Sequence, residues 1–222
     1  MTWWQYLILF LVACASTILV VPAAKSLAKR LDAIDYPSER RVNKKPIPRL
    51  GGVAIFAGII AMLLVLFLCT ELLGWRPTFL SGMMRINYFG ATLSVLVIFG
   101  VGFVDDMVSL GPKVKFLGQI VAATIAAFSG ILLSNIHNPI GPGFIEFGWV
   151  AYPITIFYLV AFANIINLID GLDGLAAGIS AICALTIFTL SVMTGRLDAA
   201  ILSIGIAGAC IGFLRYNFNL WR

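Results

Sequence analysis

Long apolar runs constrain this chain more than any other feature of its sequence. Seven runs approach the roughly 20 residues that a helix needs to cross the hydrocarbon of a bilayer: residues 3–24, 51–73, 87–104, 114–133, 149–168, 174–194 and 198–217. Only 11% of the residues are charged, whereas soluble domains carry about 25%. Because lipid offers no hydrogen-bond partner to an unpaired backbone group, only helices and closed β-barrels cross a membrane. The runs lack the alternation of apolar and polar residues that is typical of barrel strands. The sequence therefore predicts an all-α, polytopic integral membrane protein with seven transmembrane helices.

The distribution of basic residues predicts the topology. Eight of the fifteen basic residues lie in the segment 25–50, and a loop with such a cluster faces the cytoplasm. The N-terminus then lies outside, and the first run is expected to be a retained helix rather than a cleaved signal peptide, because no basic residue precedes it. Alternation leaves Arg76, Arg85 and Arg196 outside. Residues 25–50 are accordingly expected to be a basic cytoplasmic loop of a single transmembrane domain, 1–222.

Two pairs of acidic residues are predicted to reach the cytoplasmic boundary of the membrane. Asp105 and Asp106 follow the third run, and Asp170 and Asp173 follow the fifth. Both runs cross from outside to inside in this topology, so the four carboxylates arrive at one depth. A solvated acidic loop is the plain alternative, but adjacent carboxylates repel each other unless a cation or a proton lies between them. Magnesium suits such a place, because it binds one or two carboxylates together with substrate phosphates.

The stretch NIINLIDGLDGLAAG (164–178) places polar residues at intervals of three. Asn164, Asn167 and Asp170 would form one slanted stripe on a helix, whereas Asp173 would point away. The glycines inside the stretch lower the helical preference at this point. A local break is therefore expected to bring both aspartates to one site.

Basic residues add the complementary half of this site. Lys45 precedes Gly51 and Gly52, which begin the second run, and a glycine-bearing helix N-terminus is a natural anion site. Lys113 and Lys115 follow the first aspartate pair. Contact with lipid headgroups is the plain alternative for each lysine, worth roughly 1 kcal/mol. Together, the acids, the lysines and the helix N-terminus predict a site for a metal–diphosphate at one membrane face.

Three blocks of the sequence resemble the polyprenyl-phosphate N-acetylhexosamine-1-phosphate transferase family, which is glycosyltransferase family 4. They are PIPRLGG (46–52), GFVDDMVSLGPKVKFLGQ (102–119) and NIINLIDGLDGLAAG (164–178). The resemblance runs from about residue 20 to residue 219. The first block is more similar to the N-acetylglucosamine branch of the family than to the branch that makes peptidoglycan lipid I.

The resemblance implies a magnesium-dependent transfer of a sugar-1-phosphate, N-acetylglucosamine-1-phosphate in this branch. The donor would be a UDP-amino sugar, the acceptor undecaprenyl phosphate and the second product UMP. Such a transfer would start cell-wall, lipopolysaccharide or teichoic acid synthesis at the cytoplasmic face of the cell membrane. The implied partners are the UDP-sugar, the polyprenyl phosphate and the lipid bilayer, with no nucleic acid. A homodimer is left open.

By the same resemblance, each candidate residue takes a role. The aspartates matched to catalysis and to Mg²⁺ are Asp105, Asp106 and Asp170. The division of metal binding and base work between the first two is left open. The residues matched to substrate binding are Asn164, Asn167, Asp173, Lys45, Lys113 and Lys115.

The sequence departs from the family pattern in two places. Asn43 stands where family members usually carry a histidine. Members also have about ten or eleven spans, with a further aspartate and a histidine motif beyond the part matched by residues 212–218. The only histidine, His137, lies in a predicted outer loop. We expect the 222 residues to insert and fold but to turn over little substrate alone. A transporter or channel with an acidic cation path, and an inactive truncated remnant, are the alternatives left open.

Overall fold

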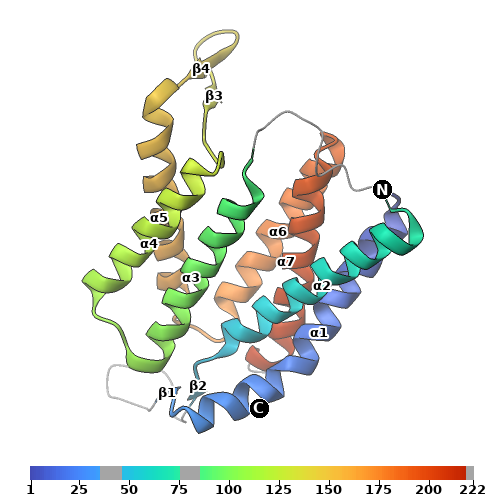
Figure 1. Ribbon diagram of the computed structural model, residues 1–222, viewed down its shortest axis with the longest axis vertical. Helices are drawn as coiled ribbons and strands as arrows, with labels where there is room; N and C mark the ends of the chain where they lie inside the picture. Colours follow the sequence, from blue (N-terminus) through green and yellow to red (C-terminus); the bar gives the residue numbers. More distant parts are fainter. Residues whose placement is uncertain (36–46, 76–85, 219–222) are drawn as a thin grey trace. The chain divides into compact units, whose positions relative to one another are not determined.

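The computed structural model describes residues 1–35, 47–75 and 86–218 (Figure 1). Seven α-helices lie in these ranges: α1 (Trp3–Arg30), α2 (Gly51–Leu73), α3 (Tyr88–Val108), α4 (Pro112–Phe128), α5 (Ala151–Ile169), α6 (Leu175–Met193) and α7 (Leu197–Asn217). The prediction of an all-α membrane protein is confirmed, because each helix covers most of one apolar run.

Short elements that the apolar pattern did not predict lie between the helices. They are the strands β1 (Ile34–Asp35), β2 (Ile47–Pro48), β3 (Asn135–His137) and β4 (Phe144–Glu146), and the 3₁₀ turn η1 (Gly148–Val150). Strands β1 and β2 pair antiparallel, and so do β3 and β4. The only histidine of the sequence therefore lies in the β3–β4 ribbon.

The first helix is longer than the apolar run that predicted it. The run 3–24 ends before the first basic residue, whereas α1 continues to Arg30. Apolarity marks only the part of a helix that lies in hydrocarbon, so it misses a charged helical extension. Lys29 and Arg30 in the last turn suit the negative end of the helix dipole.

The fourth helix is shorter than predicted. The run 114–133 continues past α4, which ends at Phe128, because Gly130 takes a φ of +94° and turns the chain. Within the described residues, six helices are long and apolar enough to cross a membrane, and the 17-residue α4 is not among them. The chain is thus a multi-pass membrane protein, and six of the seven predicted runs form helices long and apolar enough to span a membrane, whereas α4 is shorter than the sequence predicted.

The helices form two compact units. The first unit contains α1, β1, β2, α2, α6 and α7, and the second contains α3, α4, β3, β4, η1 and α5. The single transferase domain expected over residues 1–222 stays a prediction.

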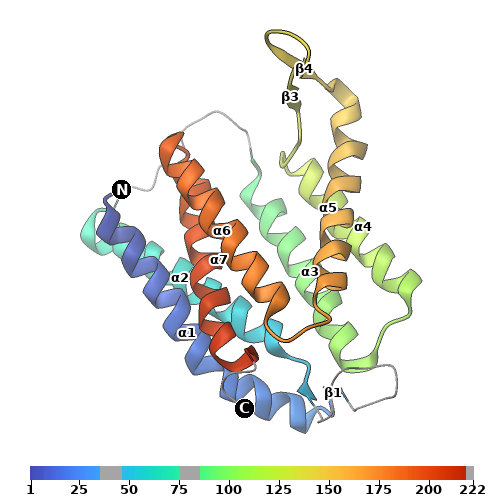
Figure 2. The ribbon, with the colours of Figure 1, turned by 180° about the vertical axis from the view of Figure 1, so that it is seen from behind.

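Close approach of main chains holds the first unit together. Helix α7 packs against both α1 and α6 (Figure 2). A Cβ atom on Gly208 would lie 2.5 Å from the main-chain oxygen of Phe10, and one on Gly212 would lie 2.5 Å from that of Cys14. Small residues four apart on one helix allow such contact, which replaces the hydrophobic effect as the driving force for helix association in lipid.

The second unit is joined by a mixture of small residues and polar bonds. Gly118 on α4 faces Val101 on α3, where a Cβ atom would lie 2.6 Å from a Val101 methyl group. The Ser94 hydroxyl of α3 donates to the main-chain oxygen of Ala122 on α4 at 3.0 Å. These contacts fix α3 and α4 as a hairpin, so that the end of α3 and the start of α4 are held together.

Candidate functional site

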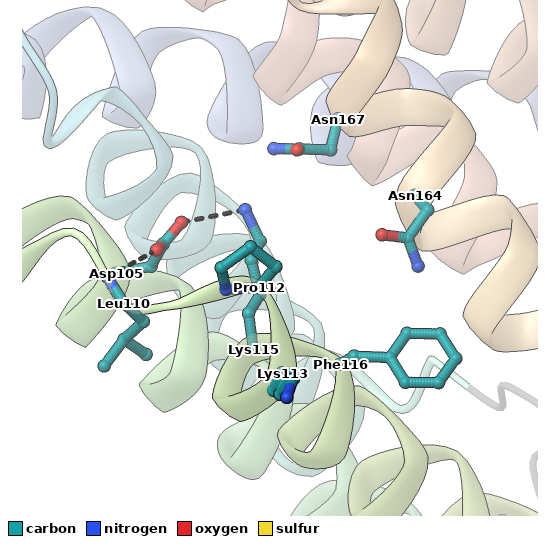
Figure 3. Close-up of a pocket in the computed structure, with 8 residues that line it drawn as sticks. All are labelled: Asp105, Leu110, Pro112, Lys113, Lys115, Phe116, Asn164 and Asn167. Atoms are coloured by element: carbon teal, nitrogen blue, oxygen red, sulfur yellow. Dashed lines mark hydrogen bonds and ion pairs between the residues drawn. The ribbon is translucent and has the colours of Figure 1, made fainter.

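A cavity of about 550 Å³ lies in the second unit, among the end of α3, the start of α4 and the last turns of α5 (Figure 3). Charged and amide side chains line it together with a few apolar groups. The lining residues are Asp105, Leu110, Pro112, Lys113, Lys115, Phe116, Asn164 and Asn167. Its volume falls within the range of sites that bind small molecules, about 300–1,000 Å³.

Asp105 is fixed at the cavity by the turn that joins α3 to α4. Ser109 ends α3 with a φ of 50°, and its N–H donates to the main-chain oxygen of Asp105. This left-handed residue turns the chain so that the next N–H, from Leu110, donates to Asp105 Oδ1 at 3.0 Å. Lys115 Nζ donates to Asp105 Oδ2 at 2.8 Å. The carboxylate is therefore held by a main-chain donor and a cation, one on each oxygen.

The start of α4 gives the cavity positive charge. Gly111 is the N-cap and Pro112 is the first helical residue, a position where a missing N–H costs nothing. Lys113 lies in this first turn and lines the cavity, and it makes no hydrogen bond or ion pair with the part of the chain that is described. The positive end of the helix dipole adds to its charge. This side of the cavity favours an anion.

The amide side of the cavity comes from α5. Asn164 Nδ2 donates to the main-chain oxygen of Val160 at 2.8 Å and to Gln119 Oε1 at 2.7 Å. Gln119 lies on α4 and is 5% exposed. Gln119 was not among the residues predicted for the site, although a lone amide in an apolar helix is a signal of polar contact between membrane helices.

The α5–α6 turn carries the second aspartate pair, in the first unit. The expected break is confirmed: α5 ends at Ile169, α6 begins at Leu175, and Gly174 between them takes a φ of +76°. Asp170 consequently lies just past the helix and not on a continuous helical stripe. Its side chain keeps contact with solvent, yet partial desolvation by the surrounding protein raises the pKa of the carboxyl.

The structure gathers part of the predicted site around the cavity. The predicted residues that line it are Asp105, Lys113, Lys115, Asn164 and Asn167. Asp106 is not among the described lining residues. Asp170 and Asp173 belong to the other unit, so the convergence of four carboxylates stays a prediction. Lys45 lies outside the described residues.

The donor set at this cavity fits Mg²⁺ in the way that this ion prefers. No group of three or more His, Cys, Asp or Glu residues that could hold a metal occurs in residues 1–35, 47–75 and 86–218. Magnesium rarely uses such a cage and is usually bound by one or two carboxylates with water and substrate phosphates. Each oxygen of Asp105 accepts one hydrogen bond, and a carboxylate has about four acceptor positions. Asp105 can therefore still ligate a cation.

Comparison with known proteins finds that the chain is similar to phosphosugar transferases. A family model described as glycosyl transferase family 4 matches residues 88–220. The chain is 36% identical to a probable undecaprenyl-phosphate N-acetylglucosaminyl 1-phosphate transferase of Bacillus subtilis, over 97% of this chain and 56% of the relative. It is 37% identical to a decaprenyl-phosphate N-acetylglucosaminephosphotransferase of Mycobacterium tuberculosis, over 94% of this chain and 53% of the relative. The chain thus spans about half the length of these relatives.

A more distant relative carries out a related transfer by its name. The chain is 29% identical to a phospho-N-acetylmuramoyl-pentapeptide-transferase of Geobacillus kaustophilus, over 94% of this chain and 64% of the relative. The lower identity agrees with the predicted placement nearer to the N-acetylglucosamine branch.

Proposed function

This chain belongs to glycosyl transferase family 4, and we propose that it transfers N-acetylglucosamine-1-phosphate from UDP-N-acetylglucosamine to undecaprenyl phosphate. UMP is the second product, and the lipid-linked sugar starts a cell-envelope polysaccharide at the cytoplasmic face of the membrane. One observation carries the proposal: Asp105, Lys113 and Lys115 line one cavity with Asn164 and Asn167. In this proposal the carboxylate binds the metal ion, the two ammonium groups bind the diphosphate, and the two amides form hydrogen bonds with the nucleotide sugar.

The proposed reaction exchanges one phosphorus–oxygen bond for another. An oxygen of the lipid phosphate attacks the β-phosphorus, which carries the sugar, and the bond from this phosphorus to the bridging oxygen breaks. The bridging oxygen leaves with UMP and keeps the bonding electron pair. Phosphoryl transfer of this kind depends mainly on positioning and on neutralising charge at the phosphoryl oxygens.

The residues at the cavity supply those two requirements in the proposal. Lys113 and Lys115 lie where they can neutralise the diphosphate, and Lys115 is itself held by Asp105 at 2.8 Å. By their match to the family motifs, Asp105, Asp106 and Asp170 are the proposed ligands of Mg²⁺, which would neutralise negative charge on the diphosphate of the bound UDP-sugar and on the departing UMP. Asp173 and Lys45 complete the substrate contacts by their match to the family motifs.

A chimera tests this proposal directly. The chain replaces the matched segment of the Bacillus subtilis relative, and the product is reconstituted in vesicles with Mg²⁺, undecaprenyl phosphate and UDP-N-acetylglucosamine. We expect UMP release that depends on the lipid phosphate. Lys113→Gln should lower the rate, whereas Lys25→Gln, which changes a lysine over the Tyr216 ring in the first unit, should not. Correct insertion of the chimera without UMP release would refute the proposal.

A further inference from the structure

Gln119 is a buried polar residue that the reaction proposed above does not use. Its neighbours on α4 include the buried residues Ala122, Ala123 and Ala126, which offer a polar group nothing to bond. Burying an amide without a hydrogen-bond partner destabilises a protein. The partner of Gln119 is Asn164, across the interface between α4 and α5, at 2.7 Å from amide nitrogen to amide oxygen.

The bonds of Asn164 fix which end of its amide faces the cavity. The Val160 carbonyl can only accept, so the nitrogen of Asn164, and not the oxygen, must lie against it. Gln119 Oε1 takes the second amide hydrogen. Both hydrogens are then used, and no described residue donates to Asn164 Oδ1. In Figure 3 this oxygen points from α5 toward the cavity.

We propose that Gln119 is a positioning residue that makes Asn164 present only a hydrogen-bond acceptor to the ligand. The ligand group at this point is therefore a donor, an N–H or O–H of the nucleotide sugar, and not a phosphate oxygen. The identity of that ligand rests on the proposed function, whereas the orientation of Asn164 does not. Phosphate oxygens are placed instead at the opposite side of the cavity, by Lys113 and Lys115.

Removing Gln119 would release this constraint. The second amide hydrogen of Asn164 would lose its buried acceptor, and only the bond to the Val160 carbonyl would still hold the amide, so that the side chain could turn toward water in the cavity. Either the nitrogen or the oxygen of the Asn164 amide could then face the ligand. The expected loss is confined to ligands that donate a hydrogen bond here.

The test measures ligand affinity of the purified chain in nanodiscs. Gln119→Met removes the acceptor but keeps the length of the side chain, and Gln119→Glu keeps an acceptor oxygen in either protonation state. The probes are UDP-N-acetylglucosamine and inorganic diphosphate, both with Mg²⁺. Thr124→Val is the matched control on α4, because the Thr124 hydroxyl donates only to Ile120 of its own helix.

We expect Gln119→Met to weaken binding of UDP-N-acetylglucosamine about tenfold, in line with the loss of one hydrogen bond. Binding of diphosphate should change by less than about twofold, because diphosphate offers Asn164 no N–H or C–OH donor. Gln119→Glu should restore the affinity, and Thr124→Val should leave it unchanged. In an Asn164→Leu background, Gln119→Met should cause no further loss.

Three results would overturn the positioning role. Equal losses for both ligands would show a general structural effect, and so would an equal loss in the Asn164→Leu background. The third result concerns thermal stability without ligand. The double variant Gln119→Met, Asn164→Leu should lose less stability than the sum of the two single losses. Additive losses would exclude the hydrogen bond between Asn164 and Gln119. If the unmodified chain binds diphosphate but not UDP-N-acetylglucosamine, the proposed donor is wrong, and this stability cycle still decides the orientation of Asn164.

Discussion

The two units associate their helices in different ways. In the first, Gly208 and Gly212 of α7 bring their main chain against the main chain of α1 at Phe10 and Cys14. In the second, side-chain hydrogen bonds cross between helices, from Ser94 to α4 and from Asn164 to Gln119. Both devices replace a hydrophobic driving force that lipid does not provide.

The difference teaches where a membrane protein can place a polar cavity. Glycine-mediated contact brings two main chains together and leaves little space between them at that point. Polar bonds join helices at single points, so a space beside these bonds can stay open. The polar side chains at the edge of such a space can also bind a ligand. The second unit has both the interhelical bonds and the cavity, and we expect mutations in the two units to separate stability from binding.

The largest effect is expected from a bulky residue in the glycine contact. Gly208→Leu would place its side chain against the Phe10 carbonyl, and overpacking of this kind costs about 1–3 kcal/mol or more. Thermal unfolding in detergent should show loss of the folded protein. Gly178→Leu on α6 is the control, because nothing lies within 4 Å of its Cβ position. Equal tolerance at both positions would break the proposed distinction between the units.

A separate effect, on the transfer rate and not on stability, is expected at Asp105. Asp105→Asn removes the negative charge that pairs with Lys115 at the cavity, and the proposed function predicts a fall in transfer of at least about 100-fold, or 2.7 kcal/mol in the barrier. The folded state should be kept, because the carboxamide still accepts from Leu110. The transfer rate of the chimera and its unfolding temperature are the two measurements. A loss under about tenfold would be too small for the role assigned.

The hydrogen bond of Ser94 should contribute modestly to the second unit. Ser94→Ala removes the bond to the Ala122 carbonyl, and such interhelical bonds average about 0.6 kcal/mol in a membrane protein. Ser203→Ala is the control, since Ser203 donates only within α7. Chemical unfolding should show a larger loss for Ser94. The same loss for both would mean that polar bonds do not join the second unit.

The smallest effect is expected from Asp170, whose side chain keeps contact with solvent. Its raised pKa means that the folded state binds the proton more tightly than the unfolded state. Stability should therefore fall as the pH rises from the ordinary aspartate pKa through the raised value. Asp170→Asn should remove that fall, so that the variant gains stability relative to the parent at neutral pH and not at low pH. A parallel pH profile for both proteins would contradict the raised pKa.

The sequence predicted those features that depend on hydropathy and on glycine. Apolar runs located the helices, and the glycines after Asp170 marked the break before α6. Helix ends were less predictable: α1 continues through charged residues that no apolar pattern can mark, and α4 stops where Gly130 turns the chain.

The site was predictable as a set of residues but not as a set of contacts. Sequence motifs singled out Asp105 and Lys115, yet only the fold shows that they pair at 2.8 Å. The bond from Asn164 to Gln119 joins residues 45 positions apart, and no local pattern predicts such a partner. An amide in an apolar helix could have marked Gln119 as a polar contact residue, but its partner could be found only from the fold.

The short fourth helix has a consequence for the lipids around it. Its 17 residues rise about 26 Å, less than the roughly 30 Å of bilayer hydrocarbon. Such hydrophobic mismatch is relieved by local thinning of the bilayer or by basic side chains that snorkel to the headgroups. Lys113, near the start of α4, is a basic side chain that can do this and also lines the cavity, whereas Lys115 is paired with Asp105. The length of the lipid acyl chains would then affect how close the lysine ammonium group stays to a ligand in the cavity. Longer lipids would draw this group toward the headgroups and away from the ligand.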